Sequence, residues 1–321
     1  MRYRASFLAL CAATLVVGPV SLSAAQVLAA DNGEWVLPWT PDGHPDLQGN
    51  WTNVTVTPIQ RPSGVGAVLT PEQVARIEGQ REGLIEAGSA ASDPERAPPP
   101  SGGTNPICID SGTSCYNYVY WDQGDRVAIF NGEPRSSLIT NPANGLIPPL
   151  TPEARQRSAE LVEFNGRFSE YDNPENRPLA ERCLISYGSN AGPPMLPNYG
   201  YNNNYTIVQT PDHIMIMTEM VHDVRIIRLG ERVPLSDHIR PWMGDSWGHW
   251  EGKTLVIETT NLPPRQLNSQ EYIYPGGSED MKVIERLTRV DGSTINYEFT
   301  VIDPGTYMQP WGGEVPMKAL E

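Results

Sequence analysis

The hydrophobic and polar positions of this chain change their spacing at about residue 201. From there to the C-terminus, short runs of apolar and β-branched residues alternate with turn-forming pairs such as Asp-Gly and Pro-Gly. Runs of this length, each bounded by a turn, are typical of β-strands. The pattern predicts eight strands, at residues 205–209, 213–218, 224–229, 246–250, 254–260, 282–289, 294–302 and about 311–317.

Eight successive short strands predict a mainly β protein, in which an antiparallel meander closes as a lipocalin-like barrel. Closure is favoured because it removes unpaired strand edges; a two-sheet sandwich is the alternative. We expect residues 201–321 to form the eight-stranded barrel and residues 31–200 to pack on it, as one compact domain. Such a barrel is either filled by side chains or just wide enough for one small ligand, so the fold permits binding without establishing it.

The chain before the barrel has fewer regular elements. Residues 35–62 are rich in Pro, Gly, Asn and Trp, which predicts an irregular N-terminal arm. Two helices are expected, one beginning at Thr70-Pro71 and one at Thr151-Pro152. Threonine caps a helix N-terminus, and proline suits the first helical position.

Residues 1–30 have the order of a secretory signal peptide. Arg2 and Arg4 precede an apolar run, and small residues follow up to Ala30. The run is interrupted at Pro19, before it reaches the roughly 20 residues that a membrane-spanning helix needs. We therefore expect a periplasmic or secreted protein with no membrane insertion.

The charge balance narrows the range of partners. The chain has 38 acidic and 23 basic residues, a formal net charge of −15. Nucleic acids are bound by clustered lysines and arginines, so a nucleic-acid partner is not expected. The expected partner is a small-molecule substrate or ligand, and the oligomeric state is left open.

The cysteines suggest one covalent link. Cys108 and Cys115 bracket a short loop, which predicts a local disulfide in an oxidising compartment. Cys183 is then left over. A small buried apolar residue is the commoner role for such a cysteine, and a nucleophile is the alternative.

Several ionisable residues lie close together in the run 219–225. On a regular strand Glu219, Asp223 and Arg225 share one face, while His222 lies on the other. Either the strand bends and directs them into a shared cleft, or one face is simply exposed to water. If there is a cleft, His222 and Glu219 are candidate catalytic residues and Arg225 a candidate substrate ligand.

A second group of candidates follows Gly244. On a strand Asp245, Trp247 and His249 point the same way. Asp245 could orient His249 as a general base, and Trp247 and Trp250 could stack on a sugar or an aromatic ring. Alternatively, Asp245 caps a turn and the tryptophans fill the end of the barrel.

Arginines near the predicted barrel could bind an anionic group. Arg182, Arg225 and Arg286 are candidate substrate ligands, because guanidinium groups hold carboxylates bidentately. Pairing of strand arginines with Glu285 or Glu298 across the sheet is the alternative.

Other common active-site motifs are missing from the sequence. Ser246 is followed by a β pattern rather than a helix, and there is no GxSxG motif, which argues against a serine hydrolase. The histidines lack the i, i+4 spacing of zinc proteases, and no glycine-rich loop follows a strand. We therefore expect no cofactor and no metal.

Several sequence blocks together resemble a large group of secreted bacterial proteins. The resemblance covers almost all of the chain after residue 30, and implies a shared fold and export, but no catalytic residue is carried over from it. The blocks are Pro41–Thr52 (PDGHPDLQGNWT), Pro148–Arg155 (PPLTPEAR), Glu181–Cys183 (ERC), Gly244–Thr260 (GDSWGHWEGKTLVIETT), Val283–Asp291 (VIERLTRVD) and Asp303-Pro304.

These features predict an extracytoplasmic, cofactor-independent enzyme. It would be a lyase, isomerase or hydrolase that uses acid-base catalysis on a small cyclic substrate such as a sugar, a glycoside or a phenolic. His222 or His249 would transfer the proton, and Arg182 or Arg225 would stabilise developing negative charge. The alternative is a periplasmic carrier of lipocalin type. A third possibility, an interaction protein, rests only on the proline-rich segments.

Overall fold

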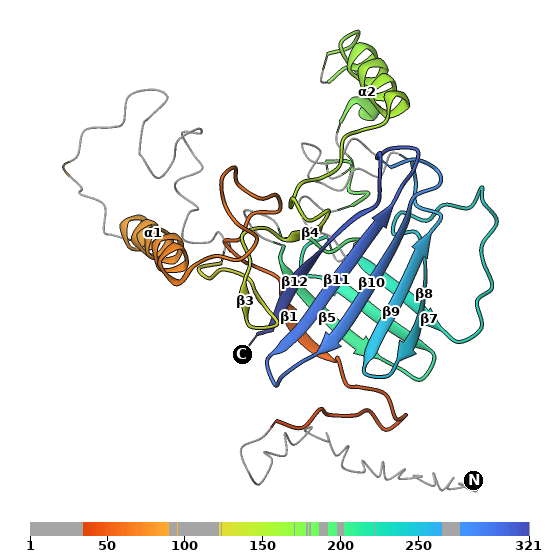
Figure 1. Ribbon diagram of the computed structural model, residues 1–321. Helices are drawn as coiled ribbons and strands as arrows, with labels where there is room; N and C mark the ends of the chain where they lie inside the picture. Colours follow the sequence, from red (N-terminus) through yellow and green to blue (C-terminus); the bar gives the residue numbers. More distant parts are fainter. Residues whose placement is uncertain are drawn as a thin grey trace, which may run out of the picture. The chain divides into compact units, whose positions relative to one another are not determined.

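A closed β-barrel forms the body of the protein (Figure 1). The computed structural model describes residues 35–89, 95, 122, 124–169, 171–177, 179, 181–185, 192–197, 202–221, 223–264 and 277–320. Within these residues nine strands make up the ring, so the predicted mainly β, lipocalin-like fold is confirmed. The strands are β1 (Gly49–Thr52), β5 (Asn204–Gln209), β6 (His213–Thr218), β7 (Val224–Leu229), β8 (Asp245–Glu251), β9 (Thr254–Thr260), β10 (Lys282–Arg289), β11 (Thr294–Ile302) and β12 (Trp311–Ala319).

Closure depends on a strand that the sequence did not predict. All eight expected strands form, but β1 joins the two ends of the sheet: Trp51 lies opposite Tyr205 of β5 and opposite Ala319 of β12. The barrel therefore has nine strands rather than eight. β1 has only four residues and begins with Gly49-Asn50, which have low β propensity, so its conformation comes from pairing on both sides.

One strand pair departs from a simple meander. β7 and β8 are parallel, with Ile227 opposite Ser246 and Leu229 opposite Gly248. Parallel neighbours need a connection that returns to the starting end of the sheet. Residues 230–244 make this return, so the expected purely antiparallel order is wrong at this pair.

Three further strands lie outside the ring. β4 (Ile139–Asn141) pairs with β12, and a Cβ atom added to Gly313 would lie 2.2 Å from the carbonyl oxygen of Leu138. Only glycine permits so close an approach of the two chains. β2 (Ile129–Phe130) and β3 (Glu133–Pro134) form a separate hairpin.

The two predicted helices are also present. Thr70 and Gln73 form a reciprocal capping box with hydrogen bonds of 3.3 and 2.8 Å, and the Thr151 hydroxyl accepts a 3.1 Å hydrogen bond from the amide three residues later. No helix among the described residues is long and apolar enough to cross a bilayer. The helical elements are α1 (Pro71–Ser89), α2 (Pro152–Asn165) and a 3₁₀ turn at Pro174–Asn176.

Large side chains pack the lumen of the barrel. Alternate residues of each strand point inward, and the inward positions of β11 and β12 include Phe299 and Trp311. These two rings meet edge to face with centroids 5.6 Å apart, and Tyr307 packs on Trp311 at 5.8 Å. The described lumen is therefore a packed hydrophobic core along much of its length.

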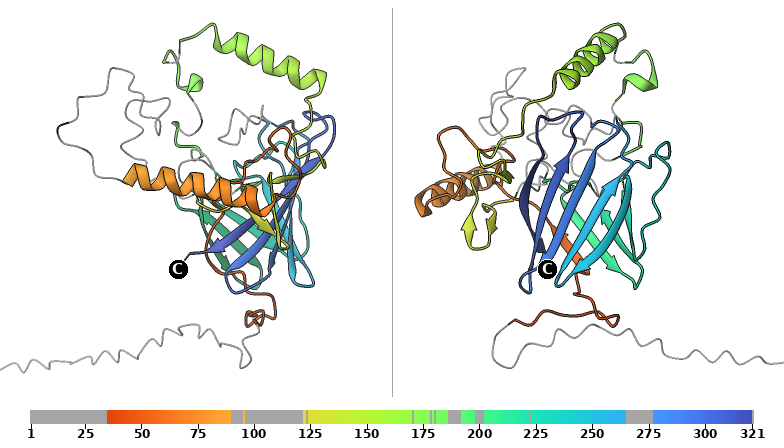
Figure 2. Two further views of the ribbon diagram at one scale, coloured as in Figure 1. Left: turned by 60° about the vertical axis from the view of Figure 1, so that its left-hand side comes forward. Right: turned by 45° about the vertical axis from the view of Figure 1, so that its right-hand side comes forward.

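The N-terminal arm lies across one end of the barrel, which we call the arm end (Figure 2). The amide of Leu47 donates a 2.5 Å hydrogen bond to the side chain of Gln209, at the end of β5. The ring of His44 stacks on Trp250, at the end of β8, with centroids 5.2 Å apart. The arm thus shields this end of the core from water.

Closure by β1 gives a test of stability. Trp51 is buried, donates a 3.0 Å hydrogen bond to the Leu47 carbonyl and lies beneath the Arg289 guanidinium. Trp51→Ala is expected to lower the free energy of unfolding by about 3–5 kcal/mol, because it leaves a cavity at the barrel seam. The half-exposed Trp39 is the control, and Trp39→Ala should change it by less than about 0.5 kcal/mol. Urea unfolding measures both; equal losses would mean that β1 does not hold the barrel closed.

Candidate functional site

Buried polar side chains gather at the end of the barrel opposite the arm. Polar residues of these types are usually exposed, so their concentration in one place is typical of a binding or catalytic site. We call this region the polar end, and it comprises Asn53, Asn202, Asn203, Tyr205, Thr218, Asp223, Arg225, Glu285 and Tyr297.

An ion pair crosses the lumen at the polar end. The Arg225 guanidinium donates to both oxygens of Glu285, at 2.6 and 2.9 Å, and the side chains are 1% and 0% exposed. The Tyr297 hydroxyl donates a 2.8 Å hydrogen bond to the same carboxylate. The pair joins β7 to β10, which are not neighbours in the sheet.

The ion pair fixes the charge states of these groups. Burial alone lowers the pKa of Arg225, but the adjacent Glu285 carboxylate outweighs this effect and raises the pKa overall. Burial and the same carboxylate raise the pKa of Tyr297 well above its ordinary value. Arg225 is therefore a cation and Tyr297 a neutral donor at physiological pH.

A short segment, residues 192–197, covers the ion pair. The Met195 amide donates a 2.9 Å hydrogen bond to the Tyr297 hydroxyl, and its carbonyl accepts a 3.5 Å hydrogen bond from Asn53. A Cβ atom at Gly192, where φ is +93°, would lie 3.3 Å from the Arg225 guanidinium. The segment therefore lies directly on the ion pair and keeps bulk water away from it.

Two carboxyl groups lie at the outer rim of the polar end. Glu219 accepts 2.8 Å hydrogen bonds from the Asn202 amide and from the Asn204 side chain. Partial burial, and then the negative charge of Glu219, raise the pKa of Asp122, although a backbone hydrogen bond from Gly124 and the nearby Arg81 oppose the shift. A carboxyl group with a raised pKa can serve as a general acid in a reaction that a second carboxyl group assists as a base.

The structure brings together only some of the residues that the sequence singled out. Glu219 and Arg225 both belong to the polar end. His222 lies outside the described residues, as do Cys108 and Cys115 with their predicted disulfide. Arg182 is exposed and so is Cys183, which is free; the expectation that Cys183 is buried is therefore wrong.

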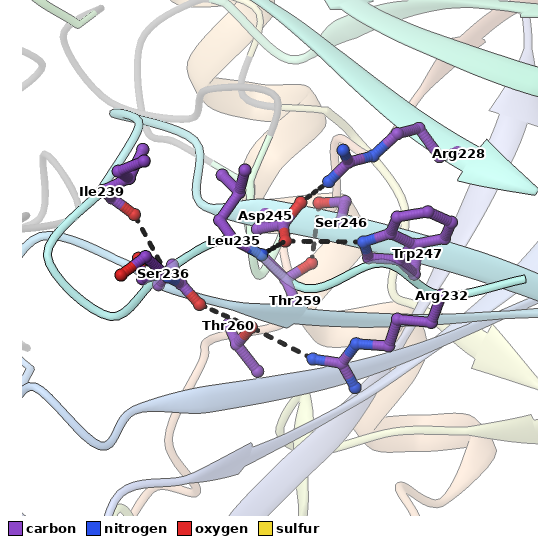
Figure 3. Close-up of polar contacts among 11 residues, drawn as sticks. Arg228, Arg232, Leu235, Ser236, Ile239, Asp245, Ser246, Trp247, Thr259 and Thr260 are labelled. Carbon is purple, nitrogen blue, oxygen red and sulfur yellow. Dashed lines mark hydrogen bonds and ion pairs between the residues drawn. The ribbon is translucent and has the colours of Figure 1, made fainter.

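Asp245 and Trp247 lie on the outer face of β8 (Figure 3). The buried Asp245 carboxylate pairs with Arg228 and accepts hydrogen bonds from the Leu235 amide at 3.2 Å and the Trp247 indole at 3.4 Å. The Arg228 guanidinium also lies over the Trp247 ring, 4.3 Å from its centroid. This cluster ties the long β7–β8 connection to the barrel wall, in keeping with the capping alternative for Asp245.

The remaining candidates are engaged outside the polar end. The His249 side chain is 61% exposed and lies 3.2 Å from Glu251, which also binds Arg286 at 2.8 Å. Trp250 is occupied by its stacking on His44. His249 and Arg286 therefore lie on the outer face of the barrel, whereas Arg225 points into the lumen and binds Glu285, the chain neighbour of Arg286.

The sequence analysis did not single out Asp122, Asn53 or Tyr297, and treated Glu285 only as a possible partner for arginines. Glu285 had a detectable signal: it alternates with the apolar Val283 and Leu287, so strand periodicity places a carboxylate inside the barrel. Asp122 had no such signal, since it precedes the hairpin in an irregular segment. Among the described residues, no cluster of three His, Cys, Asp or Glu side chains could hold a metal ion.

The ion pair gives a second test. Glu285→Leu should lower the free energy of unfolding by about 3–5 kcal/mol, because it leaves the Arg225 cation buried without a partner. The double variant Arg225→Met with Glu285→Leu should regain most of that loss. Glu251→Leu, which breaks an exposed pair with Arg286, should cost less than about 1 kcal/mol. Thermal and urea unfolding measure these losses, and a double variant no more stable than Glu285→Leu would contradict the expectation.

Comparisons of this chain with protein-family models, with curated proteins and with solved structures each found no match. The likeness to secreted bacterial proteins therefore stays a prediction.

Proposed function

We propose that this chain is an extracytoplasmic enzyme that uses acid-base catalysis at the polar end. Its substrate would be a small cyclic molecule such as a sugar, a glycoside or a phenolic, and the reaction an isomerisation, elimination or hydrolysis without a cofactor. The observation that carries the proposal is the pair of carboxyl groups at the rim of the polar end: Glu219 is held by two 2.8 Å hydrogen bonds, and the partly buried Asp122 has a raised pKa. Perturbed carboxyls of this kind concentrate at active sites.

The two carboxyl groups have complementary roles in this mechanism. Asp122 keeps its proton to a higher pH than an ordinary aspartate and serves as the general acid. Glu219, more exposed and held by two hydrogen-bond donors, serves as the general base. Arg81 of α1 acts on Asp122 electrostatically and supplies positive charge near any anion that forms.

A carrier is the second candidate function, and one observation favours it. The Arg225 Nε atom and the Asn53 Oδ1 atom are buried and have no hydrogen-bond partner among the described residues. One is a donor and the other an acceptor, so a hydroxyl group of a bound molecule could satisfy either. A carrier would retain its ligand unchanged.

The acid-base assignment predicts a specific pH dependence. An acid must be protonated to act, so turnover should fall as the pH rises through the raised pKa of Asp122. Asp122→Asn should lower kcat/KM by about 100-fold or more at every pH. Glu219→Gln removes a negative charge beside Asp122, so it should lower turnover and also move the alkaline fall to lower pH. Asp212→Asn, an exposed aspartate at the arm end, is the control and should change neither quantity.

The assay follows a mixed library of sugars, glycosides and phenolics by mass spectrometry, with the mature chain from residue 31 at a range of pH values. Thermal unfolding of each variant establishes that it is folded. Wild-type turnover in both Asp122→Asn and Glu219→Gln would remove the proposed mechanism. Loss of one component in an amount no greater than the protein, with no product, would favour the carrier.

A further inference from the structure

The outer face of β5, β6 and β7 has apolar side chains at its centre. Cross-strand pairing places Val208, Met215 and Ile226 in one row, and Thr206, Met217 and Val224 in the next. Val208 and Val224 are each 39% exposed, and Ile226 is 50% exposed. We call this surface the β5–β7 face, and its outward side chains are Asn204, Thr206, Val208, His213, Met215, Met217, Val224, Ile226 and Arg228.

Closure of the barrel does not explain why these outward side chains are apolar. A sheet with one side on the core and one side in water normally alternates apolar and polar residues. Neither helix packs extensively on these strands. Single exposed apolar residues are ordinary, but adjoining rows of them mark an interaction surface.

None of the outward side chains of the β5–β7 face is a carboxylate, in a chain with 38 acidic and 23 basic residues. Three carboxylates border the face, where they bind its outward polar side chains: Glu219, Asp212 and Asp245. Its two groups that can carry positive charge are already engaged: Arg228 pairs with Asp245, and His213 lies 2.9 Å from Asp212. The face therefore offers no unpaired cation to an acidic protein or to an anionic membrane. Its complement is another uncharged apolar surface.

We infer that a second copy of this chain binds at the β5–β7 face. Two molecules of net charge −15 repel each other, and this repulsion is reduced where the centre of the contact carries only uncharged side chains. A two-fold axis would set the face against itself, so that the rows of one copy pack on those of the other as in a two-sheet sandwich. Met215 and Met217 have flexible side chains that adapt to such packing.

The size of the face sets the strength of the dimer. Three strands about 4.8 Å apart and about 20 Å long cover roughly 300 Å². Stable complexes bury about 800 Å² on each partner. The dimer should therefore dissociate on dilution, and the equilibrium should be visible between about 1 µM and 1 mM protein.

Analytical ultracentrifugation of the mature chain across this range tests the inference. Wild-type protein should shift from monomer to dimer as its concentration rises. Ile226→Glu should raise the dimer dissociation constant at least tenfold, because it places a carboxylate in the centre of the face. Ile129→Glu is the matched control, since Ile129 is 52% exposed but lies on β2, and it should leave dimerisation unchanged. Val208→Lys gives a second variant if Ile226→Glu does not fold, and circular dichroism checks each protein.

Three outcomes overturn the inference. The first is a wild-type protein that stays monomeric up to about 1 mM. The second is a dimer that Ile226→Glu and Ile129→Glu weaken equally, which would place the interface elsewhere. The third is a monomer that sediments with uncharged phosphatidylcholine vesicles unless it carries Ile226→Glu, which would assign the face to lipid.

Discussion

Arg225 and Glu285 face each other across the lumen of a barrel whose other inward residues are mostly apolar. A buried ion pair is expensive to desolvate, and hydrophobic residues of the same volume would often serve stability as well. Here the pair orders its surroundings: it orients Tyr297, and Tyr297 holds the Met195 amide over the lumen. The positions of Tyr297 and of the segment 192–197 at the polar end therefore depend on this ion pair.

The two ends of the barrel are closed by different kinds of interaction. At the arm end, His44, Leu47 and their partners close the core with stacking and backbone hydrogen bonds. At the polar end, asparagine side chains replace strand pairing, because the turn after β6 and the segment before β5 leave backbone groups without strand partners. Glu219 satisfies one of these groups, the Asn202 amide, while its charge acts on Asp122. A single side chain thus links local structure to the chemistry of the proposed site.

Strands β6 and β7 contribute to the core, to the polar end and to the β5–β7 face. On β7, Arg225 points into the lumen, while Val224 and Ile226 point outward to the β5–β7 face. Glu219 follows β6 directly and borders both the polar end and that face. A β-strand exposes alternate residues to opposite sides, so a six-residue segment can serve the core, the site and a contact surface without competition between them.

The sequence by itself determined eight of the barrel strands and the helix starts, because strand periodicity, turn residues and threonine caps are local signals. It also indicated Glu219 and Arg225, since charged residues inside a β pattern stand out. Only the tertiary structure decided that β1 closes the barrel, that β7 and β8 are parallel, that Asp245 and His249 are engaged on the outer face of the barrel, and that the charge of Glu219 acts on Asp122. These features depend on contacts between residues far apart in the chain, and local propensity carries no information about which distant segments will pair.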